Sequence, residues 1–300
     1  MEHSTPLAIV DLLPRYAHAR RAGWTPASVM PGRITLPEYV LLRRAAIERD
    51  EAPIPYAELR ANALDPYSTI DQFLERLPRL VELGLLDQLG DEYALAPLGH
   101  HLLSRGEHAA NDYAAGRIRL PPRDLARLAS TLHDLAERQR RAPEPADKAH
   151  QNLVPRLRRF DPRQAPPFQL EYALYALQRA RDDAHIAAWR ASGFRGPAIE
   201  LLSRVWSGDA STSAELVGLT QDRMRPKDVA ALLDDLERDG YVALELPVVT
   251  ITDRGREARD AIERETDRLY FAPWGEFDAE WVRDRLEALT SALIDQPALP

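Results

Sequence analysis

Three histidines of this chain have the residue type and the placement to do chemistry together. His133, His150 and His185 fall on three different predicted helices, and imidazoles that converge from separate helices can bind a divalent metal ion. No two of them lie one turn apart on a single helix, and surface or core histidines are the more frequent outcome of such a pattern. We therefore predict that the three rings do not meet, and that the chain binds neither a metal ion nor another cofactor.

A second group of polar side chains lies on the last of these helices. Within three helical turns lie a cation, an imidazole and an aromatic ring, on Arg181, His185 and Trp189. The carboxylates of Asp182 and Asp183 lie between them in the sequence. Such a group can line a pocket for a small-molecule effector. A helix face held by salt bridges has the same pattern, so the sequence leaves the two interpretations open.

The composition excludes most catalytic classes. The chain has no cysteine, which excludes disulfides, thiol nucleophiles and thiolate zinc sites. Lys148 and Lys227 are its only lysines, so Schiff-base chemistry is nearly excluded as well. The Gly-x-Ser-x-Gly, phosphate-loop and Gly-x-Gly-x-x-Gly motifs do not occur. We therefore predict that the chain is not an enzyme.

Length and hydropathy are typical of a globular protein with more than one small domain. The chain has 300 residues, of which 45% are hydrophobic and 29% are charged. No apolar run approaches the ~18 residues that a bilayer span requires, and residues 1–10 lack the basic start of a signal peptide. We expect a cytoplasmic protein without a membrane partner.

The strongest organisational signal is an internal repeat. Four residues recur 156 positions later, in the pairs Leu77 and Leu233, Leu80 and Leu236, Gly84 and Gly240, and Gly99 and Gly255. In each copy a helical apolar stripe ends at a glycine, which suits a left-handed helix stop, and two short strand-like runs follow. Each copy therefore predicts a winged helix, which is a helix-turn-helix followed by a two-stranded β-wing.

The predicted fold is mainly helical with small β-wings, in which two winged-helix domains are joined by a helical spacer. Within the spacer, periodicity and proline positions predict helices near residues 122–141, 146–160 and 168–192. The predicted segments are an N-terminal helical extension at 1–35, winged helix 1 at 36–103, the spacer at 104–195, winged helix 2 at 196–265 and a C-terminal helical tail at 266–300. An apolar stripe on the last helix, at residues 278–294, is a candidate surface for self-association.

Two families resemble parts of this sequence. Residues 232–242, followed by residues 251–255, resemble the recognition helix and wing of the multiple-antibiotic-resistance-regulator (MarR) type, and residues 36–43 resemble the start of that domain. Residues 266–268 and 272–274 look like the tail of an uncharacterised actinobacterial helix-turn-helix family. The MarR resemblance implies a transcriptional regulator that binds double-stranded DNA. Members of that type carry one winged helix per chain and dimerise, so two copies in one chain imply an internal pseudo-dimer.

The candidate DNA-binding residues lie around the start of each predicted recognition helix, because winged helices place that end in the major groove. In the second copy they are the cations Arg223, Arg225 and Lys227. The first copy offers Ser68, Thr69, Gln72 and Arg76 at the equivalent stretch. The second copy is therefore the better candidate for binding DNA. We expect the first copy to be a structural partner of the second.

The charge distribution argues against the simplest DNA-binding interpretation. Winged helix 1 has 6 basic and 12 acidic residues and winged helix 2 has 9 and 15, so each carries a net charge of −6. Residues 104–168 of the spacer have 13 basic and 8 acidic residues, a net charge of +5. DNA-binding domains are usually basic where they meet phosphates. Two alternatives therefore stay open beside the DNA-binding regulator: a winged-helix protein-interaction scaffold that does not bind DNA, and a helical-bundle protein that binds a ligand or a metal ion.

Overall fold

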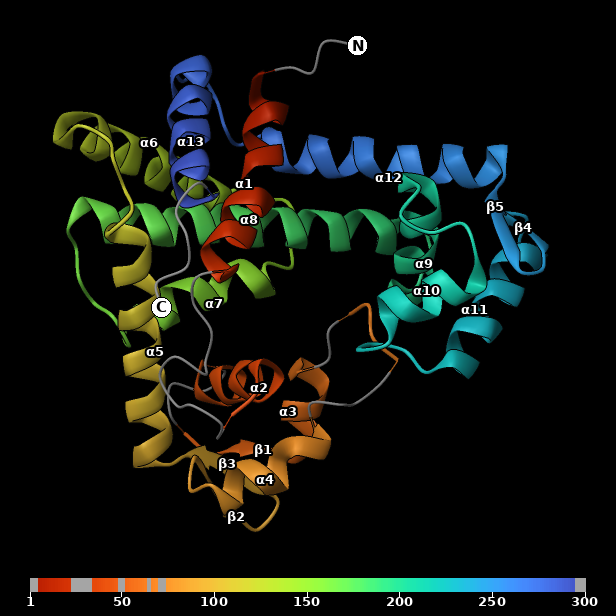
Figure 1. The fold of residues 1–300 in the computed structure, drawn as a ribbon, viewed down its shortest axis with the longest axis horizontal. Coiled ribbons are helices and arrows are strands. Elements are labelled where there is room, and N and C mark those ends of the chain that lie inside the picture. Colours follow the sequence, from red (N-terminus) through yellow and green to blue (C-terminus); the bar gives the residue numbers. More distant parts are fainter. Residues whose placement is uncertain (1–4, 23–33, 48–51, 64–65, 70–73, 295–300) are drawn as a thin grey trace. The chain divides into compact units, whose positions relative to one another are not determined.

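The computed structural model of the protein describes residues 5–22, 34–47, 52–63, 66–69 and 74–294 (Figure 1). The fold is mainly helical with two small antiparallel sheets, as the sequence predicts. The chain forms two compact units, each drawn from separate stretches of sequence. The first unit takes in residues 1–56, 78–183 and 269–300, and the second takes in residues 57–77 and 184–268.

The first unit contains most of the helices. Its elements are α1 (Thr5–Ala22), α2 (Leu36–Ile47), β1 (Ile54–Pro55), most of α4 (Leu77–Glu82), β2 (Leu86–Leu89), β3 (Glu92–Leu95), α5 (Pro97–Ala115), α6 (Pro122–Arg141), α7 (Ala149–Leu157), the longer part of α8 (Pro166–Ala191) and α13 (Ala279–Ile294). The three helices that the sequence predicts between the two wings are confirmed as α6, α7 and α8.

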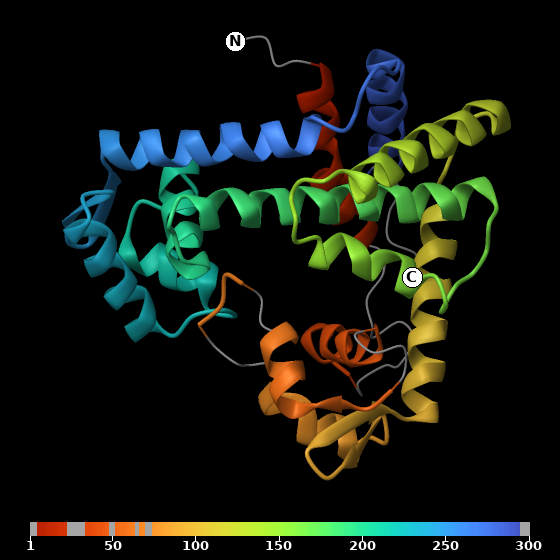
Figure 2. The same ribbon diagram turned by 180° about the vertical axis from the view of Figure 1, so that it is seen from behind.

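Apolar stripes on these helices form the core of the first unit. On α6, Leu128 and Leu132 are fully buried, as the helical periodicity predicts. Helix α13 lies beside α1 in both views (Figure 1 and Figure 2), and Val282 and Leu286 of its stripe are buried. The apolar stripe that suggested self-association through the last helix is therefore occupied within the chain.

An aromatic cluster extends this core at the end of α12 (Asp253–Phe271). Tyr270, Phe271, Trp274 and Phe277 meet edge to face, with ring centroids 5.0–5.6 Å apart. The Gln139 side chain donates to the carbonyl of Tyr270, so α6 is tied to the cluster. Trp274 of the predicted tail thus belongs to the packed core of the first unit, whereas Ala272 is exposed.

The second unit is a smaller helical unit with a two-stranded sheet. Its elements are α3 (Tyr56–Ala63), the 3-10 helix η2 (Leu74–Arg76), the end of α8, α9 (Gly196–Ser207), α10 (Ser213–Thr220), α11 (Pro226–Arg238), β4 (Val242–Glu245), β5 (Val248–Ile251) and most of α12. The predicted stripe of α11 is confirmed, because Val229, Leu232, Leu233 and Leu236 are all buried in the core of this unit.

Each wing follows a helix that ends at a glycine, and the geometry of this junction is the same in both places. Gly84 and Gly240 have φ angles of +67° and +76°, the left-handed conformation that glycine adopts without strain. The residue after each glycine donates its amide to the carbonyl five positions earlier, from Leu85 to Leu80 at 2.9 Å and from Tyr241 to Leu236 at 2.8 Å. In the first unit, β2 then pairs with β3, and β1 adds a third strand on the other side of β3. In the second, β4 pairs with β5, and Val248 of β5 forms an isolated antiparallel bridge with Thr212.

A second pair of glycines packs against these junctions. A β-carbon at Gly99 would lie 2.2 Å from the carbonyl oxygen of Leu85, and one at Gly255 would lie 2.0 Å from that of Tyr241. Neither approach leaves room for a side chain. The repeated glycines in the sequence therefore correspond to a repeated steric requirement at the start and the end of each wing.

Several predicted segment boundaries fall inside continuous elements. Helix α5 crosses the predicted boundary at 103/104, and α12 crosses the one at 265/266. Residues 57–77, which the sequence assigns to winged helix 1, belong to the second unit because residues 66–69 bond to it. The five-segment division stays a proposal. Within the residues that the structure describes, none of the helices combines the length and the apolar character of a membrane span.

Candidate functional site

The helix-turn-helix of the second unit is built from α10 and α11. Thr212 caps α10 by a reciprocal pair of bonds, from the Glu215 amide to its hydroxyl at 3.2 Å and from its own amide to the Glu215 carboxylate at 3.0 Å. The carbonyl of Thr220 accepts the amide of Met224 at 2.8 Å, and the Met224 side chain is buried in the turn. Pro226 then begins α11, where its missing amide hydrogen costs nothing. These local features fix the start of α11.

The three predicted cations near that start differ in their surroundings. Arg225 is exposed, and its guanidinium lies 3.9 Å from Glu75. Lys227 is exposed on the first turn of α11. Arg223 is half-buried, and its guanidinium lies 3.2 Å from Glu200, which also binds Arg204. Arg225 and Lys227 therefore remain accessible to a ligand, whereas Arg223 is held in an ion pair.

The predicted DNA-binding residues of the first copy lie against the turn of the second. The carbonyl of Arg223 accepts both the Ser68 hydroxyl at 2.7 Å and the Thr69 amide at 2.9 Å. The Thr69 hydroxyl donates to Asp228 at 2.8 Å. A glycine at position 196 permits this docking, because a β-carbon there would lie 1.8 Å from the carbonyl oxygen of Pro66. Ser68 and Thr69 thus stabilise the start of α11.

Two other predicted residues complete the first-copy set. Arg76 is half-buried in η2 and lines a surface hollow of about 740 Å³ next to Arg225. Gln72 lies outside the described residues. The structure therefore brings Ser68, Thr69, Arg76, Arg223 and Arg225 to one face of the second unit, around the first turn of α11.

The wing of this unit carries no positive charge. Residues 242–251 contain one charged side chain, that of Glu245, and the tip is apolar, with Leu246 74% exposed. Asp228 lies in the first turn of α11, and the other acidic residues of this helix lie in its second half, where Asp235 bonds to Arg195 and Arg238. The Arg238 guanidinium lowers the pKa of the Asp235 carboxyl below its usual range. Exposed cations thus lie at both ends of α11, with Arg225 and Lys227 at its start and Arg238 in its last turn.

The residues predicted to line a ligand pocket on α8 have separate environments. Arg181 lies over the Tyr270 ring, 5.8 Å from its centroid, in the first unit. In the second unit, His185 lies 3.2 Å from the Thr266 hydroxyl and lines a hollow of about 290 Å³. Trp189 is buried in the core, and its indole nitrogen donates to the Tyr67 hydroxyl at 3.3 Å. Of these three side chains, that of His185 lines a hollow within the part of the chain that the structure describes.

The spacer histidines also have individual partners. His133 is exposed on α6, near Glu137. The His150 ring lies 2.7 Å from Asp183, whose carboxylate also accepts the amides of His150 and Gln151 at the start of α7. In the described part of the chain, no three histidine, aspartate or glutamate side chains are grouped as metal ligands.

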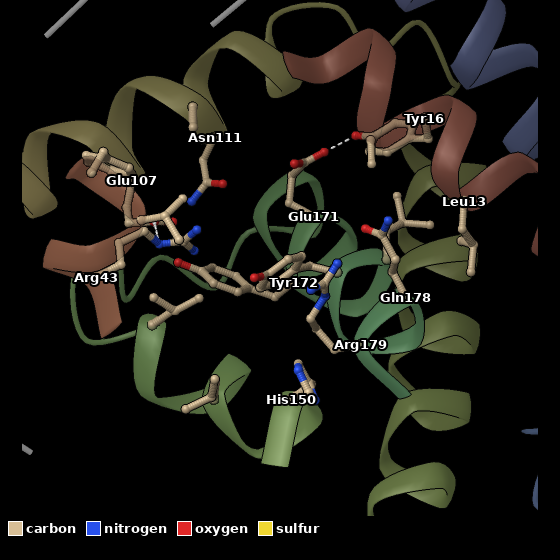
Figure 3. Close-up of a pocket in the computed structure, with 18 of the residues that line it drawn as sticks. Leu13, Tyr16, Arg43, Glu107, Asn111, His150, Glu171, Tyr172, Gln178 and Arg179 are labelled. Carbon is tan, nitrogen blue, oxygen red and sulfur yellow. Dashed lines mark hydrogen bonds and ion pairs between the residues drawn. The ribbon is translucent and has the colours of Figure 1, made fainter. Parts of the chain in front are cut away.

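A cavity that the sequence does not predict lies inside the first unit. It has a volume of about 310 Å³, and α1, α2, α5, α7 and α8 supply its walls (Figure 3). The Tyr16 hydroxyl of α1 donates to the Glu171 carboxyl of α8. On another wall, Arg43 of α2 lies 3.1 Å from Glu107 of α5. Tyrosine rings and leucine side chains fill much of the remaining wall.

Burial and charge change the acidity of two groups in this cavity. Glu171 is 5% exposed, and burial raises its pKa to about 8, so the acid is mostly neutral at pH 7. The Tyr175 ring has guanidinium groups near it, that of Arg43 at 5.8 Å and that of Arg179 at 5.2 Å from its centroid. Burial alone would raise the pKa of Tyr175, but these two cations outweigh it and lower that pKa.

The signal for this cavity in the sequence is weak. On α8, Glu171, Tyr175 and Gln178 recur at helical spacing, but a polar stripe of this kind is also what a solvated helix face shows. The cavity depends on how α1, α2 and α5 pack around that stripe, and local periodicity does not encode this packing.

The comparisons with known proteins agree with the helix-turn-helix geometry. A family model described as a helix-turn-helix family matches residues 125–300, which is more than half of the chain and includes α10, α11 and the wing of the second unit. No curated protein and no solved structure matches the chain. The extent of the family match shows that this chain belongs to that helix-turn-helix family.

Proposed function

We propose that this protein is a DNA-binding transcriptional regulator of the MarR-like winged-helix class and that α11 is its recognition helix. The observation that carries the proposal is the first turn of α11, where Arg225 and Lys227 are exposed. Both lie at the positive end of the helix dipole, and that end enters the major groove in winged-helix complexes. Asp228 shares this turn and accepts the Thr69 hydroxyl, whereas the acidic residues of α11 at positions 234, 235 and 237 lie beyond it.

The proposal includes an internal pseudo-dimer with unequal halves. The matched geometry at Gly84 and Gly240, and again at Gly99 and Gly255, supports a duplicated winged helix. Because Ser68 and Thr69 bond to the turn before α11, the first copy serves as a structural partner and the second reads DNA. We expect such a regulator to be non-catalytic and to act in the cytoplasm.

A specific observation also favours the second candidate, a protein-interaction scaffold that does not bind DNA. Arg225 lies near Glu75, and the wing that would meet the DNA backbone carries no cation. A basic partner surface would suit the acidic remainder of this unit better than phosphates would. Direct measurement of DNA binding separates the two candidates.

The experiment is selection of duplex DNA from a random pool by the full-length protein, followed by fluorescence anisotropy with the selected duplex. We expect Arg225→Gln and Lys227→Gln each to weaken binding about 10-fold to 100-fold, the loss typical of one base or phosphate contact (about 1–3 kcal/mol). Arg238→Gln is the matched control, because it removes an exposed cation from the other end of the same helix. We expect it to change the affinity less than threefold.

Two outcomes contradict the proposal. One is a pool from which no duplex is enriched, which would leave the scaffold as the better candidate. The other is an enriched duplex whose affinity is the same for Arg225→Gln, Lys227→Gln and wild type, which would place the DNA-binding surface elsewhere on the chain.

A further inference from the structure

A segment of the first copy is docked on the helix-turn-helix of the second unit. We call this segment the strap and define it by its described residues, which are 66–69 and η2 (Leu74–Arg76). The fit of the strap depends on Gly196, because a β-carbon at that position would lie 1.8 Å from the carbonyl oxygen of Pro66. The strap therefore occupies a place that the sequence of this unit keeps open for it.

The strap is bonded to the end of α11 that the proposed function assigns to DNA. The carbonyl of Arg223, in the turn before α11, accepts the Ser68 hydroxyl at 2.7 Å and the Thr69 amide at 2.9 Å. The Thr69 hydroxyl donates at 2.8 Å to Asp228, which lies in the first turn of the helix. These bonds lie on either side, in the sequence, of the two cations assigned to DNA. Thr69 is exposed, so the strap is on the outer surface of this turn.

The major groove of DNA has no room for a second segment beside this turn. The groove is about 12 Å wide, and an α-helix with its side chains has a diameter of about 10–12 Å. A recognition helix therefore nearly fills the groove. Small ions reach the exposed cations past the strap, whereas a groove must enclose the whole turn. A segment that is hydrogen-bonded to this turn has to leave before the groove can accept it.

The strap also brings a negative charge to the proposed DNA contacts. The Glu75 carboxylate lies 3.9 Å from the Arg225 guanidinium, and both side chains are more than half exposed. Arg76 is half-buried, so the exposed charge among the described residues of the strap is that of Glu75. This carboxylate offsets the attraction of Arg225 for phosphates and itself repels them. The docked strap thus opposes DNA binding by charge as well as by volume.

We propose that the strap is an autoinhibitory element, which closes the start of α11 to DNA when it is docked and must be released before DNA binds. The inference rests on the proposed function, because it concerns the regulation of the same site. The helix η2 runs directly into α4, most of which belongs to the first unit, so a conformational change there is transmitted to the strap. The apparent affinity for DNA is then the affinity of the open form multiplied by the fraction of open molecules.

The first test loosens the strap and measures DNA binding by the full-length protein, with the selected duplex and fluorescence anisotropy. The double variant Ser68→Ala/Thr69→Val removes both hydroxyls that bond to the turn and its helix. Each lost hydrogen bond shifts the docking equilibrium by about 2-fold to 10-fold, so we expect the double variant to bind the duplex at least about fourfold more tightly than wild type. Ser207→Ala is the matched control, because it removes an exposed hydroxyl from α9 of the same unit and should leave the affinity unchanged.

The second test removes the charge of the strap and leaves its hydrogen bonds in place. Glu75→Gln changes an exposed side chain, so this variant should fold as wild type does. Exposed ion pairs correspond to a factor of up to about five, and we expect DNA binding to be about twofold to fivefold tighter. Glu257→Gln is the control for net charge, since Glu257 is exposed on α12 of the same unit. Screening by salt should keep its effect within a factor of about 1.5.

Hydrogen exchange gives a readout that a merely structural role of the strap would not produce. The Thr69 amide is protected in the free protein by its bond to the carbonyl of Arg223. If DNA binding releases the strap, this amide must exchange faster in the DNA complex than in the free protein. The Met224 amide, which bonds to the carbonyl of Thr220 inside the helix-turn-helix, is the internal control and should exchange no faster in the complex.

Three results would overturn the proposal. Weaker or unchanged DNA binding by either folded strap variant would show that the strap supports the site instead of closing it. Unchanged or slower exchange of the Thr69 amide in the DNA complex would show that the strap stays docked. With either result, a duplex whose binding depends on Arg225 leaves the proposed function intact. A pool from which no duplex is enriched contradicts the proposed function itself, and this inference falls with it.

Circular dichroism shows which variants are folded. If the double variant does not fold, Glu75→Gln and the exchange of the Thr69 amide in wild type decide the question.

Discussion

At the scale of single residues, Glu171 is a carboxylic acid that is almost fully removed from water. Its carboxyl is buried and its pKa is about 8, so the folded state holds a proton that the unfolded chain releases near pH 4.5. As pH rises from about 4.5 to 8, the unfolded state gains the free energy of ionisation and the folded state does not. The contribution of Glu171 to stability therefore falls through this window.

We predict that Glu171→Gln removes this loss. Glutamine keeps an oxygen that accepts the Tyr16 hydroxyl but does not ionise. The variant and the wild type should have similar stability at pH 4.5, and the variant should be more stable at pH 8.5. The pKa difference corresponds to roughly 5 kcal/mol as an upper limit. Urea unfolding between pH 4.5 and pH 8.5 measures it.

The control for this prediction is Glu137→Gln. Glu137 is on the surface of α6, where the hydrogen bond from Arg140 lowers the pKa of its carboxyl. The ionised Glu137 carboxylate stabilises the folded state at neutral pH, and this stabilisation is lost as pH falls through its lowered pKa. Glu137→Gln should therefore not make the protein more stable between pH 4.5 and pH 8.5. Parallel stability curves for wild type and Glu171→Gln would show that the buried carboxyl is ionised at little cost.

At the scale of elements, the glycine that follows each wing sets how closely the next helix approaches. We predict that Gly255→Ala destabilises the second unit by about 1–3 kcal/mol, the usual cost of forcing atoms into a packed site. A β-carbon at this position would meet the carbonyl of Tyr241 at 2.0 Å and the side chain of Ile251 at 2.9 Å, so the start of α12 must shift. Thermal unfolding followed by circular dichroism measures the loss.

Gly218→Ala is the matched control. Gly218 is inside α10, has a helical conformation, and has no atom within 4 Å of the place that a β-carbon would take. Alanine is the better helix former by up to about 1 kcal/mol, so this variant should be at least as stable as wild type. Equal losses for both substitutions would contradict the steric explanation and point to a general intolerance of alanine in this unit.

The sequence predicts those elements whose physical causes are local. Gly84 and Gly240 mark helix ends because a left-handed residue is needed there, and α6 follows its leucine stripe from residue 122 to residue 141. The Thr212 capping box is likewise read from two residues three positions apart. The sequence also places Arg225 and Lys227 at the start of α11. Whether they contact DNA stays a prediction.

The remaining features depend on packing between residues far apart in the sequence. The sequence predicts Ser68 and Thr69 as DNA-binding residues of the first copy. In the structure, their hydroxyls bond to residues more than 150 positions later. Nothing in their own neighbourhood encodes that partner. The cavity around Glu171 has the same origin, since its lining residues become neighbours when α1, α2, α5, α7 and α8 pack.

At the scale of the whole molecule, charge is the main constraint on the proposed function. The chain carries a formal net charge of −8, so its long-range field repels nucleic acid. Binding to DNA must then depend on a few local cations that reach phosphates at short range. Such contacts release counterions from the duplex, and the affinity falls with added salt in proportion to the number of phosphates neutralised.

We predict this salt dependence for the duplex selected as described above. If Arg225 and Lys227 each neutralise one phosphate, the slope of log K against log salt is about −1.8 from these two residues, and affinity falls about tenfold between 50 and 200 mM salt. Arg225→Gln should make the slope shallower by about 0.9, whereas Arg238→Gln should leave it unchanged. A titration by fluorescence anisotropy at four salt concentrations gives each slope. An affinity for duplex DNA that is constant over this range would rule out phosphate contacts by α11, because no mode of binding through cations at a helix start avoids the release of counterions.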